Sequence, residues 1–253
     1  MNLHWINPHQ KDAAFPDPEK ALQEPNGLLA IGGDLSEARL LNAYRNGIFP
    51  WYNPEEPILW WSPDPRTVFE FDRLHVSRSL QRALRREDYR VTLDQDFASV
   101  IRACGAPRKG QPGTWLSDDM IDAYCALHQA GHAHSIEVWR EEKLIGGLYG
   151  IALGGCFFGE SMFSRASNGS KIALVWLCRQ LQAWDFDFLD GQVSSPHLQR
   201  MGASIWPRRQ FLERLKLATE KPGRIGRWSL EIDHAAAGRR FATENSGKAN
   251  VTA

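Results

Sequence analysis

Three strand-like runs follow one another closely in the second half of the chain, and they restrict its fold more than any other feature. The runs are SIEVWR at 135–140, KLIGGLYGIAL at 143–153 and CFFGESMF at 156–163. Only Gly154 and Gly155 separate the second run from the third, and two glycines between strands are a typical hairpin signal. The sequence therefore predicts an antiparallel meander of three neighbouring strands.

A helix and a fourth strand are predicted directly after the meander. Leu174, Leu177 and Leu181 recur at helical spacing and share one face of a helix over 170–184. The segment that follows, 186–190 (FDFLD), is predicted to be a strand. Three strands, a helix and another strand is the core order of acyl-CoA-dependent N-acetyltransferases. We therefore expect an α+β domain with a mostly antiparallel sheet.

The remaining residues predict a small first domain, further elements of the second domain and a tail. Residues 1–62 are rich in Pro, Gly and Trp and hold one helical signal, 36–46, with Ser36 as its N-cap and Gly47 just after its end. Apolar periodicity predicts strands at 66–71 and 89–93 and helices at 76–86, 96–104 and 117–130. Periodicity is lost after Leu215. We expect domains over 1–62 and 63–233 and a disordered tail over 234–253.

The balance of charges limits how the chain can bind a polyanion. Thirty basic residues offset thirty acidic ones, so contact with a nucleic acid requires a local basic patch. The four cysteines form no Cys-x-x-Cys pair, which disfavours a zinc site and a disulfide framework and indicates a reducing compartment. We expect a cytoplasmic protein without a membrane anchor, because the start of the chain lacks a signal peptide and the longest uncharged stretch, 144–158, is short for a bilayer.

One predicted helix carries a dense positive face. On a helical projection, its four arginines fall within an arc of about 100° opposite the apolar residues; they are Arg78, Arg82, Arg85 and Arg86. Crowded guanidiniums repel one another unless an anion is bound. Two interpretations are open: a solvated helix face, or a surface that binds the phosphate backbone of an RNA stem.

Several of the ten tryptophans stand in loops that contain Gly or Pro. Trp51 in GIFPWY and Trp115 in GTW can serve as platforms on which bases stack, or they can fix irregular loops to the core. We assign Trp60 and Trp61, in ILWWSPDP, to the core.

Three polar residues occur within or directly after apolar strands and are candidates for a site. Glu160 follows the apolar start of the third meander strand, and Asp190 and Gln192 end the fourth strand. Each could face water at an alternate strand position, whereas a carboxylate among apolar neighbours can also be a buried group with a function.

Metal and nucleophile chemistry find little support in the sequence. His128, His132 and His134 lie close together, but no cysteine or acid accompanies them at ligand spacing. No Gly-x-Ser-x-Gly motif occurs, and no cysteine stands in an activating context. We therefore predict neither a metal site nor a covalent acyl-enzyme.

Eight sequence blocks occur in the order found in one enzyme family. The blocks EPNGLLAIGGDLS, YRNGIFPWY, ILWWSPDPR, GTWLSDDM, GHAHSIEVWR, GGLYGIALG, FFGESMFSRASNGSK and LDGQV resemble the motifs of leucyl/phenylalanyl-tRNA–protein transferases. The resemblance covers about residues 15–215 and not the tail. It implies a small N-terminal domain packed on an acetyltransferase-like (GNAT-like) domain, with no metal or coenzyme A.

The resemblance also implies roles for the matched residues. The implied catalytic residues are Asp190, Gln192 and Glu160. The implied pocket for the donor's side chain includes Leu148, Phe157, Met162 and Leu177, of which Leu148 and Leu177 stand where relatives can carry Met and Phe. Trp51 and Trp115 are placed near the terminal adenosine of the tRNA, and Arg78, Arg82, Arg85 and Arg86 at its acceptor stem.

The implied reaction moves Leu or Phe, with Met as a further candidate donor, from aminoacyl-tRNA to the α-amine of proteins that begin with Arg or Lys. The products are marked for N-degron degradation, and the enzyme is expected to act as a monomer without a cofactor. An α-amine with a pKa of about 7.7 to 8.0 needs no strong base. In our hypothesis Asp190 orients the Gln192 side chain, whose amide oxygen accepts a hydrogen bond from the amine, and Glu160 positions the donor's amino group or ribose.

Two other functions are compatible with parts of the sequence. An acetyl-CoA-dependent acetyltransferase would cradle pyrophosphate in a Q/R-x-x-G-x-G/A loop before the helix. Here the loop at 165–170 reads RASNGS, with one glycine, one position late, which argues against coenzyme A. A non-catalytic RNA-binding module would explain the arginines and tryptophans, but it leaves the three polar strand residues without a role.

Overall fold

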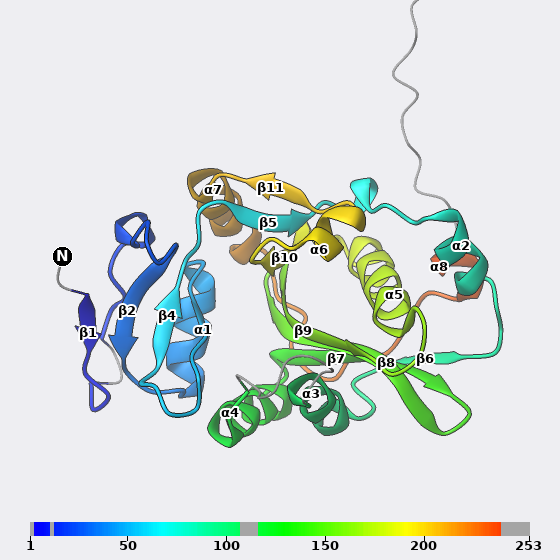
Figure 1. Cartoon of the computed structure of the whole chain (residues 1–253), viewed down its shortest axis with the longest axis horizontal. Coiled ribbons are helices and arrows are strands. Elements are labelled where there is room, and N and C mark those ends of the chain that lie inside the picture. Colours follow the sequence, from blue (N-terminus) through cyan, green and yellow to red (C-terminus); the bar gives the residue numbers. More distant parts are fainter. Residues whose placement is uncertain (1–2, 11–12, 107–115, 239–253) are drawn as a thin grey trace, which may run out of the picture.

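The computed structural model describes residues 3–10, 13–106 and 116–238, which form two sheets. The smaller sheet has the strand order β1-β2-β4-β3 and the larger one the order β11-β5-β10-β9-β8-β7-β6. Figure 1 shows the smaller sheet at the N-terminal end of the molecule, beside the larger one. The smaller sheet ends at Trp61 and the larger one begins at Arg66.

The smaller sheet contains β1 (His4–Ile6), β2 (Leu28–Gly32), β3 (Phe49–Pro50) and β4 (Leu59–Trp61). Trp60 at its centre is fully buried and donates its indole N–H to the Gly32 carbonyl over 2.8 Å, which confirms its assignment to the core. Helix α1 (Glu37–Arg45) packs beside this sheet and follows Ser36. It ends before Gly47, whose φ of 71° provides the left-handed turn that the sequence predicts there.

The larger sheet contains β5 (Arg66–Phe69), β6 (Arg90–Leu93), β7 (Ala133–Arg140), β8 (Lys143–Leu153), β9 (Cys156–Ser164), β10 (Phe188–Gln192) and β11 (Ser204–Trp206). β7, β8 and β9 pair antiparallel, so the predicted meander is confirmed. β9 and β10 pair in parallel, and every other neighbouring pair in this sheet is antiparallel. The predicted α+β class with a mostly antiparallel sheet is therefore confirmed.

Helices cover both faces of the meander and explain why its strands are apolar on both sides. The helices of this part of the chain are α2 (Arg78–Leu84), α3 (Phe97–Gly105), α4 (Asp118–Gln129), α5 (Gly169–Ala183), α6 (Pro196–Arg200) and α7 (Arg208–Thr219), and short 3-10 turns lie at Pro18–Lys20 and Phe71–Arg73. α5 lies on one face and α3 and α4 lie on the other (Figure 1). Burial on both faces removes the alternation that a half-exposed sheet would show.

The chain after Leu215 is more ordered than its composition predicts. α7 continues to Thr219, and Trp228 in the following segment is only 5% exposed. The first residues of the predicted disordered tail form helix α8 (His234–Ala237), because Asp233 caps the helix and Ala237 is buried. The rest of that tail, 239–253, lies outside the described residues.

Candidate active site

A pocket of about 410 Å³ lies where the N-terminal domain meets strands β9 and β10. Its wall from the N-terminal domain is Phe49, Pro50 and Trp51. The opposite wall comes from the larger sheet and its helices, and includes Leu148, Glu160, Met162, Leu174, Leu189, Gln192 and Leu198. The pocket is mostly apolar, with a few polar side chains that include Glu160 and Gln192 from neighbouring strands, as is typical of small-molecule sites.

A β-bulge presents Glu160 to this pocket. In the β8–β9 ladder Gly150 pairs with Gly159, whereas the next residue, Tyr149, pairs with Ser161. Glu160 is therefore the extra residue on β9. A bulge bends its strand and changes the direction of a side chain, so strict alternation cannot predict where this carboxylate points.

A second bulge lies directly opposite, on β10. Asp190 pairs with Val68 and Gln192 pairs with Thr67, which leaves Gly191 without a partner on β5. Gln192 has a φ of 58°, a left-handed conformation that costs a non-glycine residue about 1 kcal/mol or more. The parallel pairing with β9 ends at Asp190. The two bulges thus lie where β9 and β10 separate.

Glu160 and Gln192 are linked across this separation by a hydrogen bond. The Gln192 Nε2 donates to Glu160 Oε1 over 2.8 Å. No described residue donates a hydrogen bond to the Gln192 Oε1. This oxygen can therefore accept a hydrogen bond from a ligand. The pair therefore offers one carboxylate and one free amide oxygen side by side.

Two buried tyrosines hold the other oxygen of Glu160. Tyr124 of α4 donates to Glu160 Oε2 over 3.0 Å, and the hydroxyls of Tyr124 and Tyr44 lie 2.5 Å apart. Burial raises the pKa of Glu160 to about 7, although the hydrogen bonds from the tyrosines oppose the rise. The carboxyl group can therefore gain or lose a proton near neutral pH.

Asp190 lies behind the pocket rather than on its wall. Its carboxylate is fully buried and receives two hydrogen bonds from Arg66, of 2.9 and 2.6 Å. Asp190 Oδ1 also accepts the backbone N–H of Gln192 over 2.8 Å. Asp190 thus contacts the Gln192 backbone and not its side chain, because its carboxylate points to the interior where Arg66 lies. An orienting effect of Asp190 on the Gln192 side chain, as hypothesised from the sequence, therefore acts through the backbone.

The structure brings together only some of the residues suggested for donor binding. Trp51, Leu148 and Met162 line the pocket. Phe157 and Leu177 are each 1% exposed and pack in the core behind the wall instead. Leu174 takes the place of Leu177, since it lies one helical turn nearer the pocket. Trp115 lies outside the described residues.

Sequence reasoning missed Arg66, Tyr44 and Tyr124. Tyr44 and Tyr124 stand at apolar positions of helices, where periodicity marks them as core residues. Arg66 opens the apolar run RTVFEF, and a charged residue at the start of a buried strand is a signal that could have identified it.

Comparison with known proteins assigns the chain to a family. The family model described as leucyl/phenylalanyl-tRNA protein transferase matches residues 68–216, and the model of that family's N-terminal domain matches residues 33–64. A leucyl/phenylalanyl-tRNA–protein transferase from Alkalilimnicola ehrlichii is 53% identical over 247 residues, which are 96% of each chain. The chain belongs to this family of aminoacyltransferases.

The chain is also similar to a second member of the transferase family and, weakly, to a solved structure. The Cellvibrio japonicus leucyl/phenylalanyl-tRNA–protein transferase is 56% identical over 220 residues, 87% of this chain and 93% of the relative. Among solved structures, a GCN5-related N-acetyltransferase-like protein from Streptococcus suis matches with a TM-score of 0.31 and 10% identity, over 63% of this chain and 59% of that one.

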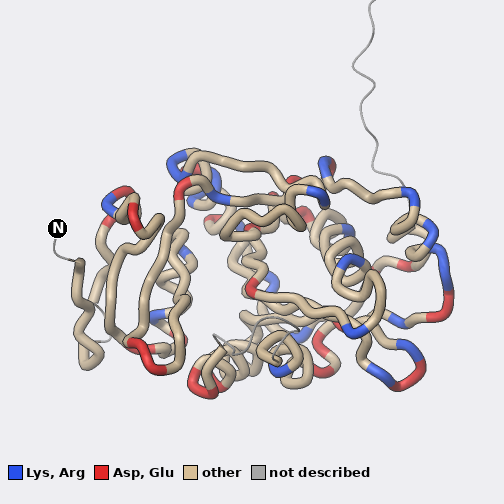
Figure 2. Tube along the Cα trace, in the orientation of Figure 1, with Lys and Arg blue, Asp and Glu red and all other residues tan. Residues whose placement is uncertain are grey.

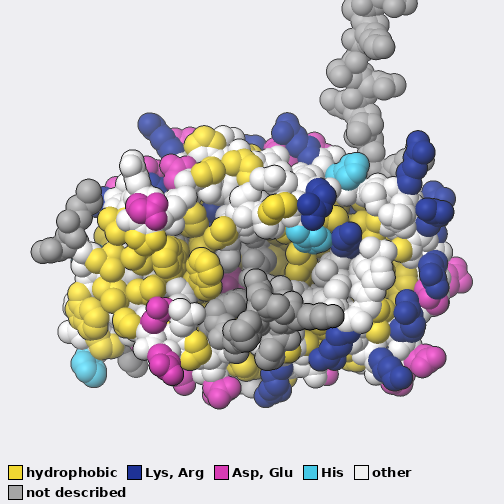
Figure 3. Space-filling view, viewed as in Figure 1, with side chains coloured by type: hydrophobic (Ala, Val, Ile, Leu, Met, Phe, Trp, Pro, Cys, Tyr) yellow, Lys and Arg dark blue, Asp and Glu magenta, His cyan; other side chains and the backbone are white. Residues whose placement is uncertain are grey.

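The arginine cluster of this transferase family member lies at one end of the molecule. α2 is shorter than predicted, because Ser77 caps it and it ends at Leu84, so two of the four arginines lie just beyond the helix. All four are exposed: Arg78, Arg82, Arg85 and Arg86. Arg86 forms an ion pair of 2.6 Å with Asp88. Figure 2 shows several basic positions along the chain at this end of the molecule, and Figure 3 shows basic side chains on the surface there.

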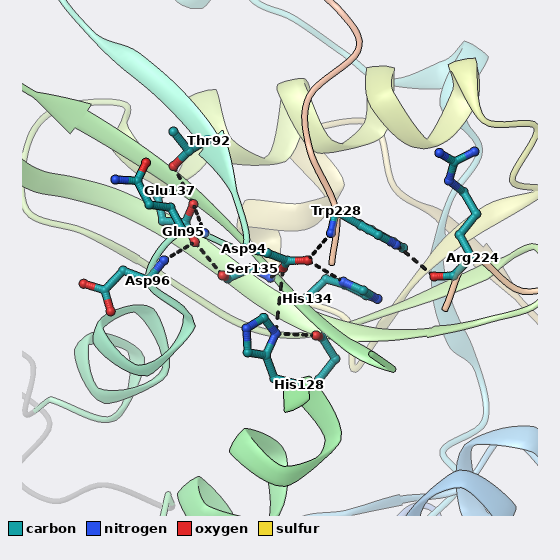
Figure 4. A network of polar contacts seen from close by, with 11 residues as sticks. Thr92, Asp94, Gln95, Asp96, His128, His134, Ser135, Glu137, Arg224 and Trp228 are labelled. Atoms are coloured by element: carbon teal, nitrogen blue, oxygen red, sulfur yellow. Dashed lines mark hydrogen bonds and ion pairs between the residues drawn. The ribbon is translucent and has the colours of Figure 1, made fainter. Parts of the chain in front are cut away.

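A buried histidine–aspartate pair lies outside the transferase pocket (Figure 4). Asp94 accepts hydrogen bonds from His134 Nδ1 over 2.8 Å and from the Trp228 backbone over 2.7 Å, and the His134 ring stacks on Trp228. Neither His134 nor Asp94 lines the pocket. Within the described residues no group of three potential ligands could hold a metal ion. The pair therefore fixes the C-terminal segment to the sheet.

Across residues 3–10, 13–106 and 116–238, no helix combines the length and the apolar character that a membrane crossing requires.

Proposed function

We propose that this chain transfers Leu or Phe, with Met as a further candidate, from aminoacyl-tRNA to the N-terminal α-amine of proteins that begin with Arg or Lys. Family membership supports the transfer reaction. The observation that carries the assignment of the site is the Glu160–Gln192 pair at two facing bulges, beside an apolar pocket. The modified proteins would be marked for N-degron degradation, and the enzyme would act as a cytoplasmic monomer without a cofactor.

The apolar part of the pocket would hold the side chain of the donor amino acid. Leu148, Met162 and Leu174 offer branched and flexible apolar surface, and a volume of about 410 Å³ is within the range of small-molecule sites. Trp51 is 44% exposed at the rim, and Trp61 fixes its backbone by donating an indole N–H to the Trp51 carbonyl over 2.6 Å. The Trp51 ring would stack on the terminal adenine.

The reaction is aminolysis of an ester. The nitrogen of the acceptor's α-amine forms a bond to the aminoacyl carbonyl carbon, and the bond from that carbon to the ribose 3′ oxygen breaks. The free Gln192 Oε1 would accept a hydrogen bond from the attacking amine. Glu160, whose pKa burial raises to about 7, would take the proton of the amine and return it to the leaving ribose oxygen.

In this proposal Glu160 transfers protons in addition to positioning the donor, because a carboxyl group with a pKa near the working pH can both accept and donate a proton.

The acceptor stem of the tRNA would lie on the surface formed by four arginines, Arg78, Arg82, Arg85 and Arg86. These side chains would contact phosphates, and such contacts do not depend on the base sequence.

The test is transfer of labelled Leu from Leu-tRNA to a peptide with an N-terminal Arg. An N-acetylated peptide and acetyl-CoA as the donor are controls. We expect transfer from tRNA only, and a loss on the order of a hundredfold in Gln192→Ala but not in Gln182→Ala, an exposed glutamine on α5. Transfer only from acetyl-CoA would refute the proposed donor, and full activity of Gln192→Ala would refute the role of Gln192.

A peptide series that differs only in the first residue tests acceptor specificity. Arg and Lys should be modified, and Gly, Leu and Glu should not. Equal rates for all first residues would leave the transfer reaction standing and refute the proposed selection of basic acceptors.

A further inference from the structure

The Arg66 guanidinium lies fully buried between the two domains, where every nitrogen has a partner. Its Nε and Nη2 donate to the two oxygens of Asp190, and its Nη1 donates to the Gly47 carbonyl over 3.1 Å. The guanidinium also lies 4.9 Å from the ring centre of Phe49 and 4.5 Å from that of Phe211. This one cation therefore contacts the N-terminal domain, strand β10 and helix α7.

On the side of the larger sheet, Arg66 acts on Gln192 through Asp190. Asp190 Oδ1 accepts the Arg66 Nε–H and the backbone N–H of Gln192 at the same time, over 2.9 and 2.8 Å. The second bond holds Gln192 in its left-handed conformation, which is unfavourable without a compensating contact. The direction of the Gln192 side chain thus depends on how Arg66 fixes the Asp190 carboxylate.

On the side of the N-terminal domain, Arg66 supports the opposite wall of the pocket. Gly47 and Phe49 flank the guanidinium, and Phe49 lines the pocket together with Pro50 and Trp51. A hydrogen bond from a guanidinium and a cation–π contact are both directional and are strengthened by burial. Both walls of the pocket are therefore attached to the same rigid, planar group.

We propose that Arg66 is a positioning residue for the transfer reaction, which sets the orientation of Gln192 relative to the Phe49–Trp51 wall without touching substrate. The inference rests on the proposed function, because it takes Gln192 as the group that meets the amine. Lysine cannot replace Arg66, since an ammonium group lacks the planar fork that binds two carboxylate oxygens and a carbonyl at once.

The experiment compares Arg66→Lys with Arg39→Lys. Arg39 is a matched control, because it is also fully buried, binds Asp34 through two nitrogens and donates to two backbone carbonyls, and it does not line the pocket. We expect both variants to lose stability, but only Arg66→Lys to lose kcat, on the order of a hundredfold. The KM for aminoacyl-tRNA should change less than about threefold, because the arginines of α2 are intact. Equal kcat losses in the two variants would overturn the inference.

A second variant covers the case in which Arg66→Lys fails to fold. Arg66→Met combined with Asp190→Asn buries no unpaired charge, and such replacements are often tolerated. The amide oxygen of the introduced asparagine can still accept the Gln192 N–H, so wild-type kcat in this double variant would show that Arg66 serves only to balance charge. We expect kcat to stay low.

Amide hydrogen exchange gives a readout that does not depend on transfer. In Arg66→Lys the segment 186–193 should exchange faster than in wild type, whereas in Arg39→Lys it should not. Unchanged exchange in Arg66→Lys would overturn the inference even if the wild-type chain transfers Leu. Absence of transfer in wild type with faster exchange in Arg66→Lys would refute the proposed function and leave the contact between Arg66 and the β10 bulge established.

Discussion

At the scale of single residues, the site combines groups that are costly to bury with groups that satisfy them. Gln192 and Tyr124 donate hydrogen bonds to Glu160. The hydroxyl of Tyr44 in turn bonds to that of Tyr124. Even so, burial keeps the pKa of Glu160 near 7, so the ionised form is less favourable in the folded protein than in the unfolded chain. The ionised carboxylate thus reduces the stability of the fold, which is a cost expected of a group with the proposed role in proton transfer.

Replacement of Glu160 by Gln should therefore stabilise the protein and reduce transfer. The pKa of Glu160 in the folded protein, about 7, lies above the ordinary value of 4.5. Protonation of Glu160 therefore contributes to the free energy of unfolding in full below pH 4.5, and this contribution is lost as the pH rises through 7. At pH 8 the variant should be more stable by up to about 3 kcal/mol. Urea unfolding of both proteins at pH 8 and pH 5.5 measures the difference, which should shrink at the lower pH. A variant that is less stable than wild type at pH 8 would contradict this view of Glu160.

At the scale of elements, regular periodicity predicts the strands and helices, whereas the local irregularities that build the site escape it. The meander, α5 and β10 follow from hydrophobic spacing and from the Gly154-Gly155 hairpin signal. The two bulges do not, since a bulge is fixed by the pairing of two strands distant in sequence. For the same reason Glu160 and Gln192 could be identified as candidates, but their mutual hydrogen bond and the role of Arg66 could not.

Helix α2 provides a test at this scale. Replacing Arg78, Arg82 and Arg85 by Ala should raise the KM for aminoacyl-tRNA about tenfold or more at moderate salt, and it should leave kcat nearly unchanged, because none of these residues lines the pocket. The salt dependence of binding should also become less steep, by about one unit for each phosphate that the variant no longer binds. Arg209→Ala on α7, an exposed arginine, is the control. An equal effect of the control would assign the binding to overall charge rather than to this surface.

At the scale of the whole molecule, the C-terminal segment fastens the far side of the larger sheet through a buried polar network. Trp228 packs against Phe157 and Phe186 and stacks on His134. Burial lowers the pKa of His134, and its Nε2 is buried without a hydrogen-bond partner among the described residues. A charged imidazole would leave this N–H unsatisfied, so the environment favours the neutral form of His134.

Acidification should weaken the attachment of the C-terminal segment to the larger sheet, because it protonates His134. Because the pKa of His134 is lowered from 6.5 on folding, His134 binds more protons in the unfolded chain, and its contribution to stability falls as the pH drops below about 6.5, by at most about 1.4 kcal/mol per unit. The pKa values of Glu137 and Glu160 are raised by burial and act in the opposite direction, so the test compares wild type with His134→Gln. The variant should show a weaker loss of stability between pH 6.5 and 5 in thermal unfolding. Parallel pH profiles would assign the acid sensitivity to another group.

The position of Arg66 also has a consequence for the synthesis of the chain. Its partner Asp190 follows 124 residues later, so a ribosome that has completed the N-terminal wall of the pocket must still make most of the second domain before that cation is neutralised. A nascent or truncated chain that ends before Asp190 holds Trp51 and Tyr44 but has neither Gln192 nor a carboxylate for Arg66. If Gln192 has the proposed role, unfinished products are expected to be inactive as transferases. The buried position of Arg66 is also expected to disfavour closure of the domain junction until strand β10, which carries Asp190, has been synthesised.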